Sequence, residues 1–111
     1  INKNFTLKKA FKFFNNTSYK CLIIVEKNNI LLGTISDGDI RKAILKGIDL
    51  NDKVNIIYNS EPFYFIQNRF TNQKAKEIFL KLKIPLIPIV DSNKKVCSII
   101  FWESVLDTKL L

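Results

Sequence analysis

The sequence predicts a mixed α/β fold of the α+β type, built from two copies of one β-α-β-β-α unit. The first observation is a repeat: shifting the chain by 65 positions aligns residues 1–46 with 66–111 without a gap. Eleven of the 46 aligned pairs are identical, where composition alone would give roughly four. The second observation is that each copy carries a helix-periodic stretch followed by two short apolar runs.

An amphipathic helix is expected near the start of each copy. In the first copy, residues 6–15 place Leu7, Ala10 and Phe14 on one stripe. Residues 71–83 repeat this pattern in the second copy. Apolar side chains at this spacing share one face of a helix, so both helices are expected to pack on a core.

Two strands follow the helix in each copy. They are expected at residues 21–26 and 30–35, and again at 86–91 and 96–101. Short turns, "KNN" and "SNK", separate the members of each pair. The first strand of each pair is too apolar to alternate, which is typical of strands buried on both faces.

A second helix is expected to begin near Asp37 in the first copy and near Trp102 in the second, with Gly47 as the stop of the former. Because 46 residues bury too little apolar surface alone, we expect the copies to pack around a pseudo-twofold axis, with two related clefts between them. The predicted organisation is a first repeat at 1–46, a linker with a short helix and the start of the second repeat at 47–65, and a second repeat at 66–111.

Composition excludes several function classes. The net charge is +8, but only Arg41 and Arg69 among the 18 basic residues are arginines, which makes nucleic-acid binding unlikely. There is no histidine, and Cys21 and Cys97 lie far apart in apolar runs. This pattern predicts no metal site, no catalytic residues and two buried, reduced thiols in a cytoplasmic protein. No apolar run approaches the ~18 residues of a membrane span, and the start at Ile1 indicates a fragment of a longer protein.

The stretch "GTISDGD" at residues 33–39 has two interpretations. In one, Ser36 and Asp39 form a capping box at a helix N-terminus, or Asp37 caps instead. In the other, the helix N-terminus and Ser36 bind a phosphate, Asp39 accepts hydrogen bonds from a ribose diol, and Arg41 or Lys42 neutralises phosphate charge. In that second interpretation the glycines keep the approach open.

Several motifs of the chain resemble those of the cystathionine-β-synthase (CBS) domain, which occurs in tandem pairs. "IPIVD" and "LIIVE" resemble the family's strand, "GTISDGD" its nucleotide motif, and "VNIIYNSEP" the short helix and proline turn before a second repeat. The string "GTISDGDIRKAILKGIDLNDKV" further resembles the CBS pairs attached to sugar-phosphate nucleotidyltransferases, and less closely those behind sugar-phosphate isomerases.

The resemblance implies a tandem CBS pair that binds an adenosine nucleotide (AMP, ADP or ATP) in a cleft, with no other cofactor. The ligand-binding residues implied by motif are Thr34, Ser36, Asp37, Asp39, Arg41, Asn59, Tyr64, Ile84 and Pro85. For Tyr64, Ile84 and Pro85, ordinary core packing is an equal alternative, and Asn59 could instead be a turn residue.

The second copy departs from the motif. "FWES" at 101–104 replaces "SDGD", so Phe101 stands where a hydroxyl is needed and Ser104 where a carboxylate is needed. We expect one nucleotide per chain. The corresponding site of the second copy is expected either to bind nothing or to bind another ligand.

The resulting prediction is a regulatory, non-catalytic module that controls an attached enzyme, with a sugar-phosphate nucleotidyltransferase as the expected parent. The expected partners are a nucleotide, the attached catalytic domain and a second copy in a homodimer, without membrane contact. The alternative is a ligand-independent dimerisation scaffold whose aromatic residues bury across a twofold interface. Those residues are Phe63, Phe65, Phe101 and Trp102.

Overall fold

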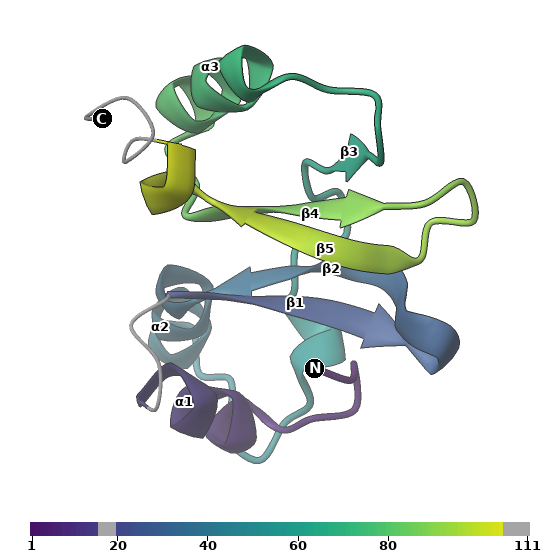
Figure 1. Ribbon diagram of the computed structural model, residues 1–111. Coiled ribbons are helices and arrows are strands. Elements are labelled where there is room, and N and C mark those ends of the chain that lie inside the picture. The colour runs from purple at the N-terminus through teal and green to yellow at the C-terminus, as the bar shows by residue number, and fades with distance from the viewer. Residues whose placement is uncertain (16–19, 106–111) are drawn as a thin grey trace. The chain divides into compact units, whose positions relative to one another are not determined.

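Figure 1 shows a computed structural model of the chain, which describes residues 1–15 and 20–105. The chain forms two compact units, Ile1–Pro62 and Phe63–Leu111, and each combines helices with antiparallel strands. The predicted α+β fold class is therefore confirmed. In the described part of the chain, no helix combines the length and apolar character needed to cross a bilayer.

The first unit packs two helices beside a two-stranded antiparallel sheet (Figure 1). Its helices lie close to the predicted ranges, and a 3-10 turn, η1, joins the two strands. A second 3-10 turn, η2, follows in the linker. The elements are α1 (Leu7–Asn15), β1 (Cys21–Glu26), η1 (Lys27–Asn29), β2 (Ile30–Ser36), α2 (Asp37–Leu45) and η2 (Val54–Ile56).

The core of the first unit is the predicted helical stripe packed on the sheet. Leu7, Ala10 and Phe14 are buried, as the periodicity of α1 predicts. They form one cluster with side chains from both strands, from α2 and from the linker: Ile24, Ile35, Ile40 and Val54. The linker thus contributes a fully buried side chain to the first unit.

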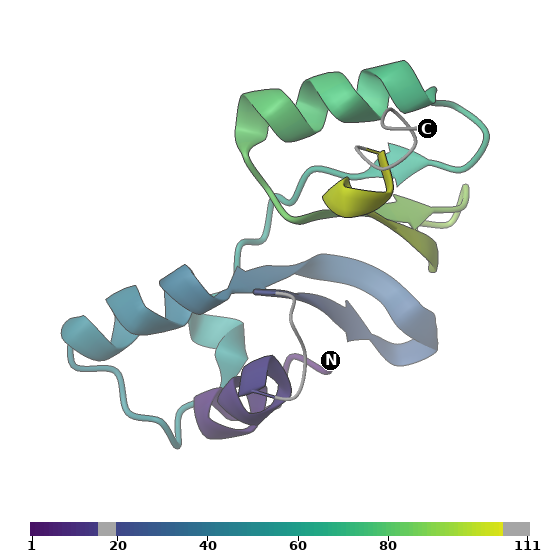
Figure 2. The ribbon, with the colours of Figure 1, turned by 60° about the vertical axis from the view of Figure 1, so that its left-hand side comes forward.

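The second unit contains a three-stranded sheet in the order β3-β4-β5, with one face covered by a helix (Figure 2). β3 runs parallel to β4, and β4 is antiparallel to β5. All five residues of β4 are buried, as expected, whereas β1 is only partly buried. The elements are β3 (Phe65–Ile66), α3 (Asn72–Leu82), β4 (Leu86–Val90) and β5 (Val96–Phe101).

The 65-residue repeat extends to the register of the strands. Cys21 pairs with Ser36 in the first unit, and Leu86 pairs with Phe101 in the second. Each pair of strands also contains an irregularity at the same place, after Ile24 and after its counterpart Ile89. A one-residue slip would move every side chain to the opposite face, so the two hairpins bury equivalent residues.

The helix entries repeat as well. The Thr6 hydroxyl accepts a hydrogen bond from the N–H of Lys9 at 3.1 Å, and the Thr71 hydroxyl accepts one from Lys74, also at 3.1 Å. Such a bond satisfies an N–H that has no partner within the helix. The two identical Thr–Lys pairs of the repeat are therefore two copies of one helix cap.

The linker folds back on the first unit. The N–H of Leu7 donates to the Asp52 carbonyl at 2.9 Å, and the N–H of Lys8 donates to the Leu50 carbonyl at 2.9 Å. The N–H of Val54 donates to a carbonyl on the same side, that of Phe5, at 2.8 Å. Residues 48–59 therefore pair the backbone groups at the start of α1.

Gly33 is required by this covering segment. A Cβ at this position would lie 2.1 Å from the Asn59 carbonyl oxygen and 2.5 Å from the Tyr58 ring. The absent side chain therefore makes room for residues 58 and 59, and our interpretation that this glycine keeps a ligand approach open is wrong.

We predict that Gly33→Ala lowers the free energy of unfolding by about 1–3 kcal/mol, because the methyl group must displace backbone. The matched control is Gly38→Ala, whose Cβ would meet only Ser36 Oγ at 3.7 Å. That change should raise stability by about 0.4–1 kcal/mol. Urea unfolding of both variants measures the difference, and equal stabilities would contradict the close approach.

Candidate functional site

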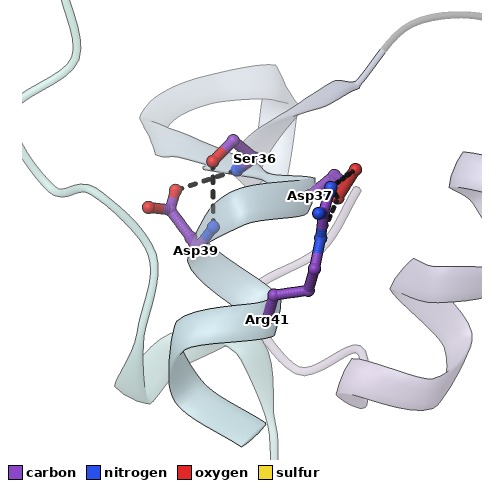
Figure 3. Close-up of polar contacts among 4 residues, drawn as sticks. All are labelled: Ser36, Asp37, Asp39 and Arg41. Carbon is purple, nitrogen blue, oxygen red and sulfur yellow. Dashed lines mark hydrogen bonds and ion pairs between the residues drawn. The ribbon is translucent and has the colours of Figure 1, made fainter. Parts of the chain in front are cut away.

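The end of β2 and the start of α2 form a capping box. Ser36 Oγ accepts a hydrogen bond from the Asp39 N–H at 3.0 Å, and Asp39 Oδ2 accepts one from the Ser36 N–H at 2.9 Å (Figure 3). Ser36 has the extended backbone of an N-cap, so Ser36, and not Asp37, caps the helix. The structural interpretation of this motif is confirmed.

The capping box leaves part of the Asp39 carboxylate available. Its Oδ2 atom is held by Ser36, and Figure 3 shows the other oxygen directed away from Ser36. An ionised carboxylate offers about four acceptor positions, and the described residues 1–15 and 20–105 use one of them. The half-buried Asp39 is therefore a fixed side chain that still has capacity to accept hydrogen bonds.

The helix N-terminus offers fewer free donors than we expected. The N–H of Asp37 donates to the Lys20 carbonyl at 3.0 Å, and the N–H of Asp39 donates to Ser36. A phosphate bound at a helix N-terminus needs unpaired N–H groups of the first turn. Two of these groups already have partners, which weakens the phosphate role of this helix end.

Arg41 is paired with Asp37. Its guanidinium donates from Nε to Asp37 Oδ1 at 3.2 Å and from NH2 to both carboxylate oxygens (Figure 3). The hydrogen bond and charge of Asp37 raise the pKa of Arg41. The arginine side chain is 68% exposed, so a phosphate could reach it, but would compete with Asp37 for the cation.

Thr34 and Asn59 lie next to each other. The Thr34 N–H donates to the Asn59 carbonyl at 3.1 Å, and the Asn59 N–H donates to the Thr34 carbonyl at 2.8 Å. Asn59 Oδ1 accepts from the Glu61 N–H at 3.0 Å, so the asparagine is also a turn residue. The structure thus brings the linker, through Asn59, to the strand that carries Ser36.

The other three predicted residues belong to the second unit. Tyr64 is 37% exposed, with Lys94 Nζ 5.7 Å from its ring centroid. Ile84 packs against the core of this unit, and the Pro85 carbonyl accepts from the Trp102 N–H at 3.2 Å. Core packing is therefore supported for Ile84, and a shared nucleotide site with the first unit stays a prediction.

The aromatic residues that we expected at a dimer interface are mostly packed inside the second unit. Phe65 is only 7% exposed and stacks on Phe70 with ring centroids 4.5 Å apart. Phe63 makes an edge contact with Phe65 at 5.2 Å, and Phe101 is half-buried. Trp102, 41% exposed, is the one large exposed side chain of the four, and their joint role at an interface stays a prediction.

Cys21 lies close to the site, and its thiol is expected to be unreactive. Burial raises the pKa of its thiol to about 12, and the negative charge of Asp39 contributes in the same direction. Cys97, in contrast, is exposed, so our expectation of two buried thiols is wrong for this residue. Its Sγ donates to the Ile89 carbonyl at 3.4 Å. Both cysteines are free.

Sequence reasoning missed the role of the linker. It placed Asn59 in the site but not Tyr58, which packs over Gly33 beside it. The apolar run "VNIIY" could have indicated that the linker packs on the first unit, because it is more hydrophobic than a solvated linker requires.

Comparisons with known proteins agree with this architecture. The family model for the CBS domain matches residues 1–46, which is the first repeat. An uncharacterized protein of Helicobacter pylori (strain J99 / ATCC 700824) is 34% identical over 88 residues, which are 79% of this chain and 27% of that protein. A homoserine O-acetyltransferase of Methanococcus vannielii is 28% identical over 111 residues, an alignment that covers 97% of this chain and 22% of that protein. The chain thus spans about a quarter of these relatives.

Solved structures of CBS-pair proteins share the fold. The structure of CBSX2 in complex with AMP covers 99% of this chain, and 85% of that chain is matched, with a TM-score of 0.86 and 17% identity. CBSX2 has also been solved as a CBS-pair protein from Arabidopsis thaliana. The cytosolic domain of the Mg2+ channel MgtE in complex with ATP covers 97% of this chain and matches over 43% of its own, with a TM-score of 0.80 and 18% identity. The predicted CBS-pair fold is confirmed.

We predict that one of the two thiols reacts with a disulfide reagent in the native protein. Cys97 is exposed, whereas the Cys21 thiol is buried and protonated at neutral pH, and the thiolate is the reacting form. Absorbance after mixing at pH 8 should count about one thiol rapidly and both after denaturation. A Cys97→Ser variant that still reacts rapidly would contradict this assignment.

Proposed function

We propose that this chain is a regulatory, non-catalytic module that binds one adenosine nucleotide (AMP, ADP or ATP) and thereby controls an enzyme joined to it. The observation that carries the proposal is the Asp39 carboxylate, which the capping box holds in place while the part of the chain that the structure describes leaves some of its acceptor capacity unused. The fold supports the same conclusion, because neighbours of this fold were solved in complex with AMP and with ATP.

Asp39 is the proposed ribose-binding group. Both hydroxyls of a ribose diol are donors, and a carboxylate is the side chain that accepts from both. The bond to Ser36 fixes the orientation of this carboxylate before the ligand arrives, so little side-chain freedom is lost on binding. Preorganisation of this kind favours affinity without adding any contact.

The remaining residues have weaker assigned roles. Thr34, Ser36 and Asn59 lie along the same strand end as Asp39, and we propose that they line the sugar and phosphate path. Arg41 would hold a phosphate by exchanging its bond to Asp37 for one to the ligand. Tyr64, Ile84 and Pro85 would supply apolar contact to the adenine from the second unit.

Regulation follows if the nucleotide contacts both units. A ligand shifts a conformational equilibrium only by its difference in affinity for the two states. Because the proposed ligand residues come from both units, their relative arrangement is the equilibrium that a nucleotide would bias. The sugar-phosphate nucleotidyltransferase as parent enzyme rests on the resemblance of residues 33–54, and the homodimer and cytoplasmic location stay predictions from the sequence.

We predict that Asp39→Asn weakens AMP, ADP or ATP binding by roughly 10- to 100-fold, because a charged acceptor is worth about 1.5–3 kcal/mol. Asparagine keeps an oxygen that can accept from the Ser36 N–H, so the helix cap and the fold should survive. Asp39→Ala should lose both the affinity and about 1 kcal/mol of stability. Calorimetric titration and thermal unfolding separate the two effects.

Glu77→Gln is the matched control, since it also neutralises one carboxylate but lies on an exposed face of α3. Its nucleotide affinity should equal that of the wild type. Absence of heat and of thermal shift with all three nucleotides in the wild-type protein would refute the proposal. A dimer whose sedimentation ignores nucleotide would then favour the scaffold alternative.

We predict one bound nucleotide per chain. The second repeat has Phe101 and Ser104 where the first has Ser36 and Asp39, so it lacks both the capping hydroxyl and the diol acceptor. Calorimetry should give a molar ratio near one, abolished by Asp39→Asn at the same protein concentration. A ratio near two would show that the second repeat retains a nucleotide site.

A further inference from the structure

Asp39 and Arg41 lie on opposite faces of α2. Successive residues of an α-helix are about 100° apart, so side chains at positions i and i+2 point about 200° apart. Figure 3 shows the Asp39 carboxylate on one side of the helix start and the ion pair of Asp37 with Arg41 on the other. Arg41 is therefore on the far side of the helix from a ribose held by Asp39.

Lys42 shares a face of α2 with Asp39. The two residues are three positions apart in the helix, and side chains at this spacing are neighbours on its surface. Helical side chains also point back toward the N-terminus, so the lysine stem extends toward the end of the helix that Ser36 caps. Arg41 shows the same direction, since it reaches back four residues to Asp37.

The Lys42 ammonium group is available to a ligand. Lys42 is exposed, and within residues 1–15 and 20–105 it has no ion pair. The residue four positions before it is Gly38, which has no side chain that could compete for the charge. Arg41, in contrast, has a carboxylate at the equivalent position and is held by it.

The surface beside Gly38 has room for a ligand group. Gly38 is exposed. Apart from its chain neighbours and the helix backbone, the described atom within 4 Å of a Cβ at this position is Ser36 Oγ, at 3.7 Å. The Ser36 hydroxyl uses an acceptor position in the cap, so it keeps its proton to donate. A hydroxyl donor therefore borders this open surface, and Lys42 approaches it from the next turn.

A phosphate close to Asp39 requires a cation on the same face. A phosphate monoester carries about −1.5 to −2 charges at pH 7. The Asp39 carboxylate that would hold the ribose repels this charge, because like charges a few ångströms apart oppose each other. A lysine ammonium group offsets both charges, and its three donors can rotate toward the phosphate oxygens.

We propose that Lys42 binds the phosphate nearest the ribose, together with the Ser36 hydroxyl, over the open surface at Gly38. This inference rests on the function proposed for Asp39, and it assigns the phosphate of the same ligand to a residue outside the set implied by the motif. Arg41 is then left for the phosphates farther along ADP or ATP, because it lies on the other face and must first leave Asp37.

The test is a calorimetric titration of the 111-residue protein with AMP and with adenosine, which lacks the phosphate. Lys42→Gln should weaken AMP binding by roughly 3- to 30-fold, a range that allows for solvent screening of an exposed charge. The same variant should bind adenosine as the wild type does. Arg41→Gln should weaken AMP binding by less than Lys42→Gln.

Lys46→Gln is the matched control. It removes the same charge from the C-terminal end of α2, one turn farther from Asp39, and should bind AMP as the wild type does. Glutamine and lysine have similar helix propensities, so both lysine variants should keep the wild-type unfolding temperature.

Gly38→Ala tests the open surface independently of charge. Its methyl group would occupy the place assigned to the phosphate, so AMP should bind at least about 3-fold more weakly. Because this change is expected to stabilise the fold, a loss of affinity with an undiminished unfolding temperature cannot come from misfolding.

The outcomes separate this inference from the function proposed above. If the wild type binds AMP and Lys42→Gln binds it equally well, the inference is overturned and the proposed function stands. Equal losses for Lys42→Gln and Lys46→Gln, a larger loss for Arg41→Gln, or an equal loss of adenosine affinity in Lys42→Gln would overturn it as well. Failure of the wild type to bind either ligand would refute both proposals.

Discussion

The reciprocal hydrogen bonds between Ser36 and Asp39 are the constraint on which the candidate site depends. They end β2, start α2 and fix the orientation of the carboxylate in one step. The same pair explains why a helix cap and a ligand site look alike in the sequence: both need a hydroxyl and a carboxylate three residues apart at a helix N-terminus. Here the cap is present, and its hydrogen bond uses Asp39 Oδ2, so the cap itself does not occupy the other oxygen.

The two repeats are alike in the backbone and different in chemistry. Strand register, the irregularity after Ile24 and Ile89, and the threonine caps all repeat at a spacing of 65 residues. In contrast, Phe101 and Ser104 stand where the first copy has Ser36 and Asp39, so the second copy lacks the hydroxyl and the carboxylate of the capping box. Packing constrains the backbone in both copies, whereas the carboxylate at this position, that of Asp39, is present in the first copy and absent from the second.

The sequence predicted the elements well, because their signals are local. The stripe of α1, the start of α2 at Asp37 and the buried strand β4 follow from periodicity and from capping chemistry. It failed for groups whose role depends on a distant partner. Gly33 was assigned to a ligand approach but faces the Asn59 carbonyl, and Phe65 was expected at a surface but stacks on Phe70.

By itself, the sequence determined the duplication, the fold class and the position of Asp39 at a helix N-terminus. The duplication follows from comparing the chain with itself, and the other two follow from residues within about one turn or one strand of each other. Only the tertiary structure decided that Arg41 is paired with Asp37 and that residues 48–59 cover the start of α1. The second of these outcomes depends on which backbone groups find partners across long sequence separations, which a local sequence pattern does not encode.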